Sequence, residues 1–272
     1  MKAINEQVIL VTGATDGHGK GVALDLARRG ATILVHGRDP KRIERTMAEI
    51  RKAAKGVSVR PYRADFASLG QVRAMAGLVL SSEPRLDALV NNAGVGVIVP
   101  GNGSRAVSGE GYEYRFAVNY LAPYLLTRLL LPKLRASAPS RIVNVSSAGQ
   151  QAIDFNDVML DRGYSGIRAY CQSKLAQILF TIDLAEELSG TGVTVNALHP
   201  ATYMPTKIVP NPISSLEEGV NATMRLVADA SLDGTSGRYF NGFADARADD
   251  QAYRPDARKK LRELSDRLTG LA

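Results

Sequence analysis

The amino-acid sequence predicts an α/β fold: one domain built on a doubly wound parallel sheet of about seven strands, with helices on both faces. Short apolar runs rich in β-branched residues alternate with stretches of helical period along most of the chain. Such alternation is typical of parallel sheets, because each crossover between parallel strands needs a long connection, usually a helix. The first apolar run, residues 8–11, is followed by a glycine-rich turn and a helix. We therefore expect the fold to start from this strand.

Local patterns predict the individual elements. Apolar runs predict strands at 8–11, 32–36, 57–62, 86–90, 141–145 and 193–198, with a last short strand at 237–240. Helical spacing predicts helices at 20–29, 40–54, 68–81, 112–135, 169–188, 216–229 and 255–268. Asp39 caps the second of these helices with Pro40 in its first turn. The long helix at 112–135 should bend near Pro123.

Three stretches lack a sustained period. Residues 95–109 are irregular and contain several glycines, and residues 148–167 form a surface excursion that leads to the helix at 169–188. Residues 200–215 contain four prolines, which forbid a regular helix, so we expect a substrate loop there, just past a strand end. No linker or internal repeat divides the chain, and we assign residues 1–272 to a single domain that closes with the helix at 255–268.

Composition excludes several classes of protein. The formal charge of +7 is scattered, without a basic arm or interleaved aromatic residues, so we expect no nucleic-acid binding. The N-terminus lacks the apolar run of a signal peptide, and no run approaches the length of a membrane span. The single cysteine, Cys171, excludes an internal disulfide and favours a cytoplasmic location. His18, His36 and His199 share no ligand spacing with it, so we expect no metal.

The turn after the first strand reads Thr12-Gly13-x-x-x-Gly17-x-Gly19. Glycines let the backbone approach a pyrophosphate, and the following helix offers unpaired amides and the positive end of its dipole. A plain turn is the alternative, but the position between a buried strand and a helix favours phosphate binding in a Rossmann-type dinucleotide fold. We therefore expect a dinucleotide cofactor.

The second strand ends in His36-Gly37-Arg38, without the carboxylate that normally takes the ribose hydroxyls of NAD. Arg38 offers a charge-assisted contact to a 2′-phosphate instead. Asp39 is one residue further on and is better explained as the helix cap. The sequence therefore predicts NADP(H) rather than NAD(H).

Tyr170 and Lys174 are one helical turn apart on the helix at 169–188, so their side chains should share a face. A positive charge about 4 Å from the phenol oxygen favours the phenolate by roughly 1–4 kcal/mol and lowers the pKa of the tyrosine toward neutrality. Such a tyrosine is suited to general acid–base catalysis. Alone, however, a Tyr-x-x-x-Lys pair is often a solvated helix face.

Together, five motifs resemble the short-chain dehydrogenase/reductase family in order and spacing over nearly the whole chain. They are TGATDGHG at 12–19, NNAG at 91–94, Asn119, Ser146-Ser147 and YCQSK at 170–174. The 23-residue step from Ser147 to Tyr170 is similar to the retinol-dehydrogenase-like branch, which includes light-dependent protochlorophyllide reductases.

The resemblance implies a catalytic set of Asn119, Ser147, Tyr170 and Lys174. Tyr170 would exchange a proton with the substrate oxygen, and Lys174 would lower its pKa and bind the nicotinamide ribose. Ser147, rather than Ser146, would hold the substrate oxygen, and Asn119 would hold a water that passes protons to Lys174. A satisfied buried amide is the alternative for Asn119.

The resemblance also implies cofactor contacts, with Asp65 at the adenine. The full set is Gly13, Thr15, Asp16, Gly17, His18, Gly19, Arg38, Asp65, Asn92, Ala93, Gly94, Tyr170, Lys174, Pro200 and Thr202. Asp65 could instead cap a helix, and residues 91–94 could be only a turn. Two positions depart from the family pattern: His18 replaces the usual isoleucine, and His199-Pro200-Ala201 replaces His-Pro-Gly.

From these residues we expect an NADP(H)-dependent oxidoreductase that interconverts a carbonyl and an alcohol by hydride transfer. Its substrate would be a small molecule, lipophilic by analogy with the retinol-like branch. Members of the family often form dimers or tetramers, so the resemblance is compatible with a homo-oligomer. One alternative is a binding protein that senses the nucleotide without turnover. The other is a sugar-nucleotide epimerase or dehydratase, whose first turn resembles TGxxGxxG rather than the TGxxxGxG found here.

Overall fold

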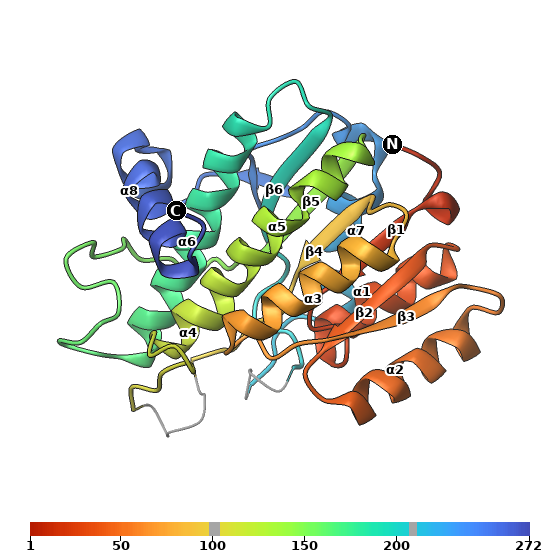
Figure 1. The fold of residues 1–272 in the computed structure, drawn as a ribbon, viewed down its shortest axis with the longest axis horizontal. Helices are drawn as coiled ribbons and strands as arrows, with labels where there is room; N and C mark the ends of the chain where they lie inside the picture. The colour runs from red at the N-terminus through yellow and green to blue at the C-terminus, as the bar shows by residue number, and fades with distance from the viewer. Residues whose placement is uncertain (98–103, 207–210) are drawn as a thin grey trace.

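The computed structural model describes residues 1–97, 104–206 and 211–272 (Figure 1). In these ranges eight strands form one sheet in the order β3-β2-β1-β4-β5-β6-β7-β8. The strands are β1 (Val8–Val11), β2 (Thr32–Gly37), β3 (Val59–Arg63), β4 (Ala88–Asn91), β5 (Ser140–Val145), β6 (Val193–His199), β7 (Tyr239–Asn241) and β8 (Ala244–Ala246). All neighbouring pairs are parallel except β7 and β8, which are antiparallel. The α/β class, the parallel sheet and the Rossmann-type arrangement are as predicted.

Helices cover both faces of the sheet. They are α1 (Gly17–Arg28), α2 (Pro40–Ala53), α3 (Leu69–Ser82), α4 (Tyr114–Phe116), α5 (Ala122–Ala136), α6 (Gly166–Glu187), α7 (Leu216–Ala228) and α8 (Pro255–Thr269), with short helical turns η1 (Ile4–Glu6), η2 (Ala117–Leu121), η3 (Ala230–Leu232) and η4 (Asp250–Tyr253). Figure 1 shows α3 and α5 side by side across one face. None of the helices within the described ranges is long and apolar enough to cross a bilayer.

Side-chain alternation along the strands separates two apolar cores. Leu10, Leu34 and Leu89 point to the core that α3, α5 and α6 close. Their neighbours Ile9 and Ile33 point to the opposite core, which α1, α2 and α7 close. Because adjacent residues of a strand face opposite sides, a strand buried on both faces must be apolar throughout, and this explains the continuous apolar runs of the sequence.

The strand order reverses at β1, which pairs with β2 on one side and with β4 on the other. Connections leave this point in opposite directions, so the carboxyl ends of β1 and β4 flank a crevice. Ligands of open α/β sheets bind at such a point, and the glycine turn after β1 and residues 91–94 after β4 both lie there.

The structure differs from the sequence prediction in three elements. The sheet has eight strands instead of about seven, because β8 turns back on β7. Helix α1 begins at Gly17 rather than at residue 20, because Asp16 caps it. The expected helix at 112–135 starts at Tyr114 and contains a π-helical turn, η2, before α5; the interruption falls next to Pro123, whose missing amide hydrogen disfavours a regular ladder there.

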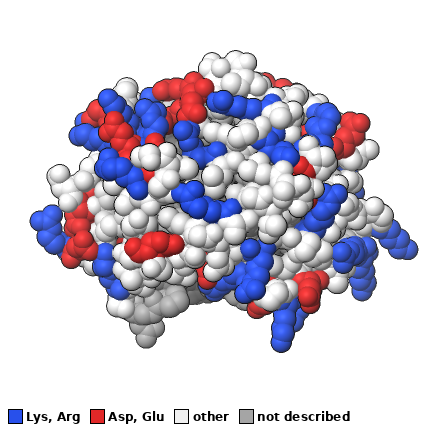
Figure 2. Space-filling model, viewed as in Figure 1, with Lys and Arg blue, Asp and Glu red and all other residues white. Residues whose placement is uncertain are grey.

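The other predicted elements are present, with ends displaced by up to three residues. The described parts of the expected substrate loop, 200–206 and 211–215, contain neither helix nor strand. Residues 207–210 of that loop and residues 98–103 of the irregular stretch lie outside the described residues. Figure 2 shows Lys and Arg side chains spread over one face of the molecule with Asp and Glu among them, so the net charge forms no continuous patch on that face.

Candidate active site

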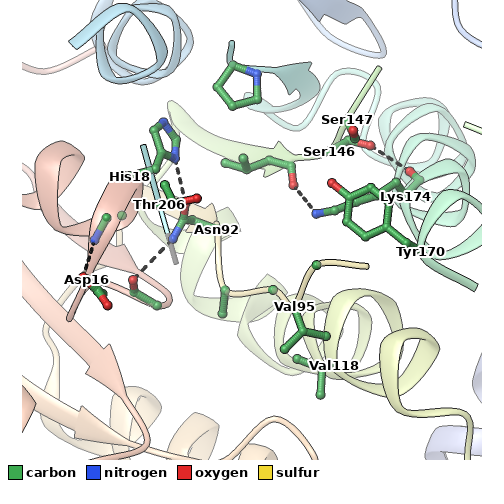
Figure 3. Close-up of a pocket in the computed structure, with 18 of the residues that line it drawn as sticks. Asp16, His18, Asn92, Val95, Val118, Ser146, Ser147, Tyr170, Lys174 and Thr206 are labelled. Atoms are coloured by element: carbon green, nitrogen blue, oxygen red, sulfur yellow. Dashed lines mark hydrogen bonds between the residues drawn. The ribbon is translucent and has the colours of Figure 1, made fainter. Parts of the chain in front are cut away.

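A cleft of about 770 Å³ opens at the carboxyl ends of the central strands. The segments that follow β1, β4, β5 and β6 all line it, as the sheet topology requires. It brings together every site residue predicted from the sequence except Asn119, which lies buried beside it. In Figure 3, Asp16, His18 and Asn92 lie on one side of the pocket, and Ser147, Tyr170 and Lys174 lie on the other.

The glycine turn uses its glycines for conformation and for space. Gly13 and Gly17 have φ values of +65° and +48°, in the left-handed region that side chains disfavour. A Cβ on Gly19 would collide with the side chain of Asn92 and with the carbonyl oxygen of Gly13. The turn can therefore hold its shape only with glycine at these positions, and it presents the amino end of α1 to the cleft.

Residues 91–94 brace this turn rather than merely reversing the chain. Thr12 Oγ1 accepts hydrogen bonds from the backbone amides of Asn92 (2.9 Å) and Ala93 (3.0 Å), and it donates to Val90 O at 3.1 Å. Asn92 Nδ2 donates in return to Thr12 O at 2.8 Å. The segments after β1 and β4 are thus locked together through Thr12, which the sequence analysis named as the first residue of the motif without predicting this role.

His36 supports the same turn. Its Nδ1 accepts from the amide of Gly13 at 3.0 Å, and its Nε2 donates to Ala64 O at 3.2 Å. Burial lowers the pKa of His36 to about 4, so the ring stays neutral. The sequence analysis placed His36 at the end of the second strand and found no metal-ligand spacing for it, but missed its hydrogen bond to the turn, since the contact joins residues 23 positions apart.

Arginine side chains surround the end of the cleft next to β2. Arg38 is exposed and lines the cleft, and Arg63 Nε donates to the carbonyl oxygen of Arg38 at 3.2 Å. Arg42 also lines the cleft and forms an ion pair with Asp16. Asp39 also lines the cleft, and its Oδ1 accepts from the amide of Lys41 at 2.9 Å, so it caps α2 as predicted.

Asp65 lines the cleft just after β3. Its Oδ1 accepts from the amide of Ala67 at 3.0 Å, whereas the cap of α3 is Ser68. The alternative reading of Asp65 as a helix cap is therefore excluded. Thr15, Ala93, Pro200 and Thr202 also line the cleft, and His199 Nε2 lies 3.0 Å from Thr202 Oγ1.

Tyr170 and Ser147 lie next to each other on one side of the cleft. The hydroxyl of Ser147 is close enough to Tyr170 to lower the pKa of the phenol, and its Oγ accepts from the amide of Gly149 at 3.0 Å. Ser146 turns the other way, donating from Oγ to Lys174 O at 2.7 Å, as expected for neighbours at a strand end. Ser147, not Ser146, thus stands beside the phenol.

The ammonium of Lys174 is buried and is held by acceptors on β5 and α6. Its Nζ donates to Val145 O at 2.9 Å and to Gln177 Oε1 at 3.1 Å, and it lies 5.9 Å from the centroid of the Tyr170 ring. Burial lowers the pKa of Lys174 to about 8. Gln177 is a further residue that the sequence did not single out.

The lowered tyrosine pKa expected from the sequence is not found in the structure. Burial raises the pKa of Tyr170, and the nearby hydroxyl of Ser147 offsets this only in part. The expectation assumed an ammonium about 4 Å from the phenol oxygen, whereas the hydrogen bonds of Lys174 run to Val145 and Gln177. Tyr170 is therefore protonated at neutral pH in this arrangement.

Asn119 lies on the π-helical turn η2 with its amide fully engaged. Its Oδ1 accepts from the amide of Val95 at 2.7 Å, and its Nδ2 donates to Val95 O (3.1 Å) and to Ser173 Oγ (3.0 Å). The alternative of a satisfied buried amide thus holds. A Cβ on Gly94 would stand 3.2 Å from Asn119 Oδ1 and 3.6 Å from Lys174 Nζ, so both atoms border the same space beside that glycine.

Comparison with known proteins agrees with this arrangement. A family model described as short chain dehydrogenase matches residues 7–212. The chain belongs to the short-chain dehydrogenase family. Among its relatives, retinol dehydrogenase 13 of Homo sapiens is 38% identical over 286 residues, which cover 97% of this chain and 85% of the relative. Retinol dehydrogenase 12 of Bos taurus is 34% identical, with coverage of 97% and 87%.

Two solved structures that share this fold were determined with NADP bound. A short-chain dehydrogenase from Shigella flexneri, complexed with NADP, has a TM-score of 0.72 and 25% identity, over 89% of this chain and 99% of that one. A Pseudomonas aeruginosa protein, RhlG, complexed with NADP, has a TM-score of 0.70 and 25% identity, over 89% and 99% of the two chains. The chain is thus an oxidoreductase of the short-chain dehydrogenase family, in its retinol-dehydrogenase-like branch.

Proposed function

We propose that this protein is an NADP(H)-dependent oxidoreductase that interconverts a carbonyl and an alcohol, with Tyr170 as the general acid and base. The observation that carries the proposal is the position of Tyr170 beside Ser147, in the same cleft as a glycine turn that leaves room for phosphates. NADPH bound in this cleft would supply a hydride, and the protein would supply position and protons.

Ser147 and Tyr170 would act on the substrate oxygen together. Both hydroxyls can donate to one oxygen atom, and negative charge develops on that atom as a carbonyl is reduced. The raised pKa of Tyr170 keeps the phenol protonated at neutral pH, which suits a proton donor to that oxygen. The buried ammonium of Lys174 would then stabilise the phenolate that the transfer leaves behind.

Proton return to Tyr170 would pass by Lys174. A water held beside Gly94 by Asn119 Oδ1 would take a proton from solvent and deliver it to Lys174 Nζ. Asn119 would act as a positioning residue, since its amide ties Val95 to Ser173 on α6. This supports the proton route that the family resemblance implies.

A preference for NADP(H) is the second part of the proposal. Arg38 stands where an acidic residue would take the ribose hydroxyls of NAD, and Arg63 adds positive charge beside it, while the charge of Arg42 is paired with Asp16. A phosphate dianion is bound well by guanidinium groups, because their donors match its oxygens in pairs. Two structural neighbours crystallised with NADP agree with this choice.

A lipophilic alcohol or aldehyde fits the substrate side of the cleft. Around Tyr170 the lining consists mainly of apolar and aromatic side chains, namely Val95, Val97, Tyr114, Val118, Ile167 and Tyr203. Burial of a hydrocarbon substrate against such a lining is favourable, and the lining offers few hydrogen-bond partners to the hydroxyls of a sugar. The relatives named retinol dehydrogenase support the same class, and this lining disfavours a sugar nucleotide.

A screen of aldehydes, ketones and secondary alcohols tests the proposal, with the absorbance of the reduced nicotinamide as readout. We expect oxidation of NADPH with at least one lipophilic aldehyde or ketone, at a higher kcat/KM than with a polar carbonyl of similar reactivity. NADPH binding without turnover of any member of the series would favour the nucleotide-sensing alternative instead.

A further inference from the structure

Gly149 lies two residues after Ser147 and lines the cleft beside the two hydroxyls of the proposed reaction. A Cβ on this glycine would stand 3.5 Å from Ser147 Oγ, 3.5 Å from Cys171 Sγ and 3.7 Å from Tyr170 Cε1. These are ordinary van der Waals contacts. The missing side chain therefore leaves a gap, which one methyl group would fill, between three side chains that line the cleft.

Neither the backbone nor the packing requires glycine at position 149. The φ angle of Gly149 is not in the left-handed region, in contrast to those of Gly13 and Gly17. An added Cβ would collide with nothing, in contrast to one on Gly19. Gly149 thus keeps space open in the cleft, whereas the glycines of the turn after β1 are needed for its shape.

The wall that carries Gly149 is held in place by hydrogen bonds. Ser147 O accepts from Tyr239 Oη at 3.1 Å and from Gln150 Nε2 at 3.1 Å. Gln150 Oε1 accepts in turn from the amide of Asp249 at 2.8 Å. These bonds tie the segment after β5 to β7 and to the residues that follow β8, so the wall cannot withdraw from an added group without breaking them.

Cys171 bounds the same gap from α6. It follows Tyr170 directly, is half-buried and lines the cleft. Burial raises the pKa of the Cys171 thiol, so the group is uncharged at neutral pH and forms a small apolar wall. The gap thus lies between a bare α-carbon and a sulfur atom.

The place of the gap relates it to the carbon that reacts. A substrate oxygen bound by the hydroxyls of Ser147 and Tyr170 would have its carbonyl carbon about 1.2 Å further on. That carbon bears two more substituents. The long lipophilic one has the apolar lining described above, and the other needs room close to the two hydroxyls. The space beside Gly149 borders both of these side chains.

We infer that Gly149 and Cys171 set the size of the second substituent of the carbonyl carbon, so that the cleft accepts methyl ketones and the matching secondary alcohols as well as aldehydes. The inference rests on the proposed function. A hydrogen atom or a methyl group has room between the bare α-carbon and the sulfur, and a larger group meets Cys171 Sγ. Both residues would then determine specificity without taking part in proton transfer.

A series of carbonyl compounds tests this inference. The long apolar group stays constant, and the second substituent grows from hydrogen through methyl and ethyl to isopropyl. For each compound, kcat/KM of a variant is divided by that of the wild-type chain, so the intrinsic reactivity of the carbonyl cancels. In Gly149→Ala we expect a loss at least about tenfold greater for the methyl ketone than for the aldehyde, because one misplaced methylene in a pocket costs about 10- to 200-fold.

Cys171→Ala changes the gap in the opposite direction. Removal of the sulfur enlarges the space, so kcat/KM for the ethyl ketone should rise by about tenfold relative to that for the methyl ketone. Gly70→Ala on α3 is the matched control for the glycine change, because a Cβ there meets only Ser68 Oγ, at 3.8 Å. Its kcat/KM relative to wild type should be the same for every compound in the series.

NADPH affinity, measured by fluorescence titration, separates the possible failures. With NADPH bound normally, an equal loss for all compounds in Gly149→Ala, or turnover of aldehydes alone by the wild-type chain, would overturn the inference and leave the proposed function intact. Should Gly149→Ala fail to fold, Cys171→Ala decides, and an unchanged ratio of ethyl to methyl ketone there would overturn it. Binding of NADPH by the wild-type chain without turnover of any carbonyl would remove the proposed function and this inference with it.

Discussion

The Nζ of Lys174 lies 5.9 Å from the ring centroid of Tyr170 and gives hydrogen bonds to Val145 O and Gln177 Oε1. The ammonium is therefore held by acceptors on β5 and α6, and the hydrogen bonds seen in the described part of the chain do not link it to the phenol. This makes the charge state of Lys174, and not only its presence, a requirement of the proposed chemistry.

The pH dependence of reduction follows from that charge. Burial lowers the pKa of Lys174 to about 8, so the ammonium is present below this pH and is lost above it. We expect kcat for carbonyl reduction to be level below about pH 7 and to fall by about tenfold per pH unit above about pH 8. Gln177→Leu removes an acceptor of the charged form, so its decline should begin at lower pH. A profile that stays level to pH 10 would contradict this role.

Arg38→Asp tests the cofactor preference. The change removes a guanidinium and places a carboxylate near the proposed 2′-phosphate, so the Kd for NADPH should rise by about 10- to 100-fold, while that for NADH changes by only a few-fold. Fluorescence titration of both nucleotides measures the ratio. Arg51→Asp, at an exposed position near the end of α2, is the matched control for net charge and should leave the ratio unchanged. Equal losses of NADPH and NADH affinity with Arg38→Asp would refute the phosphate contact.

Gly19→Ala tests the glycine turn. The added Cβ would strike Asn92 and the carbonyl of Gly13, so the brace between the segments after β1 and β4 must shift, and we expect NADPH binding to weaken by at least about tenfold. Gly77→Ala is the matched control, because a Cβ there meets nothing within 4 Å. It lies inside α3 and should stabilise the fold by roughly 0.5–1 kcal/mol in urea unfolding while leaving affinity unchanged. Normal NADPH affinity in Gly19→Ala would count against the proposed phosphate site.

Most of the fold could be predicted from the sequence because the central strands are buried on both faces. Such strands appear as continuous apolar runs, as at residues 8–11. The sequence could not predict β8, a three-residue strand whose residues Ala244–Ala246 carry no apolar pattern and pair with β7 through the backbone. The sequence analysis also missed the π-helical turn that contains Asn119. A single π-helical turn leaves the spacing of apolar residues on either side of it unchanged, so the pattern still predicts one continuous helix.

In the candidate site, too, features with a local sequence pattern were predicted and long-range contacts were not. Residues close in sequence, such as Gly17 and Gly19, or recognisable by motif, such as Ser147 and Tyr170, were found from the chain alone and line one cleft. Supporting contacts between distant segments were not found. One example is Arg115, which is fully buried. Its guanidinium donates hydrogen bonds to Glu113, Tyr164 and the carbonyl oxygens of Gly96 and Val97, and these contacts fix one wall of the cleft. A buried arginine has no local signal, since its partners are chosen by tertiary packing.

The most direct test of the proposed function measures both turnover and NADPH binding by the variant Tyr170→Phe. The change removes one oxygen from a ring that lines the cleft, so the fold and the cofactor side of the cleft should stay intact, and the Kd for NADPH should remain within about twofold. With the proton donor gone, kcat for reduction of an accepted carbonyl should fall by about 100- to 10,000-fold. Turnover at the wild-type rate by Tyr170→Phe would contradict the assignment of Tyr170 as the acid.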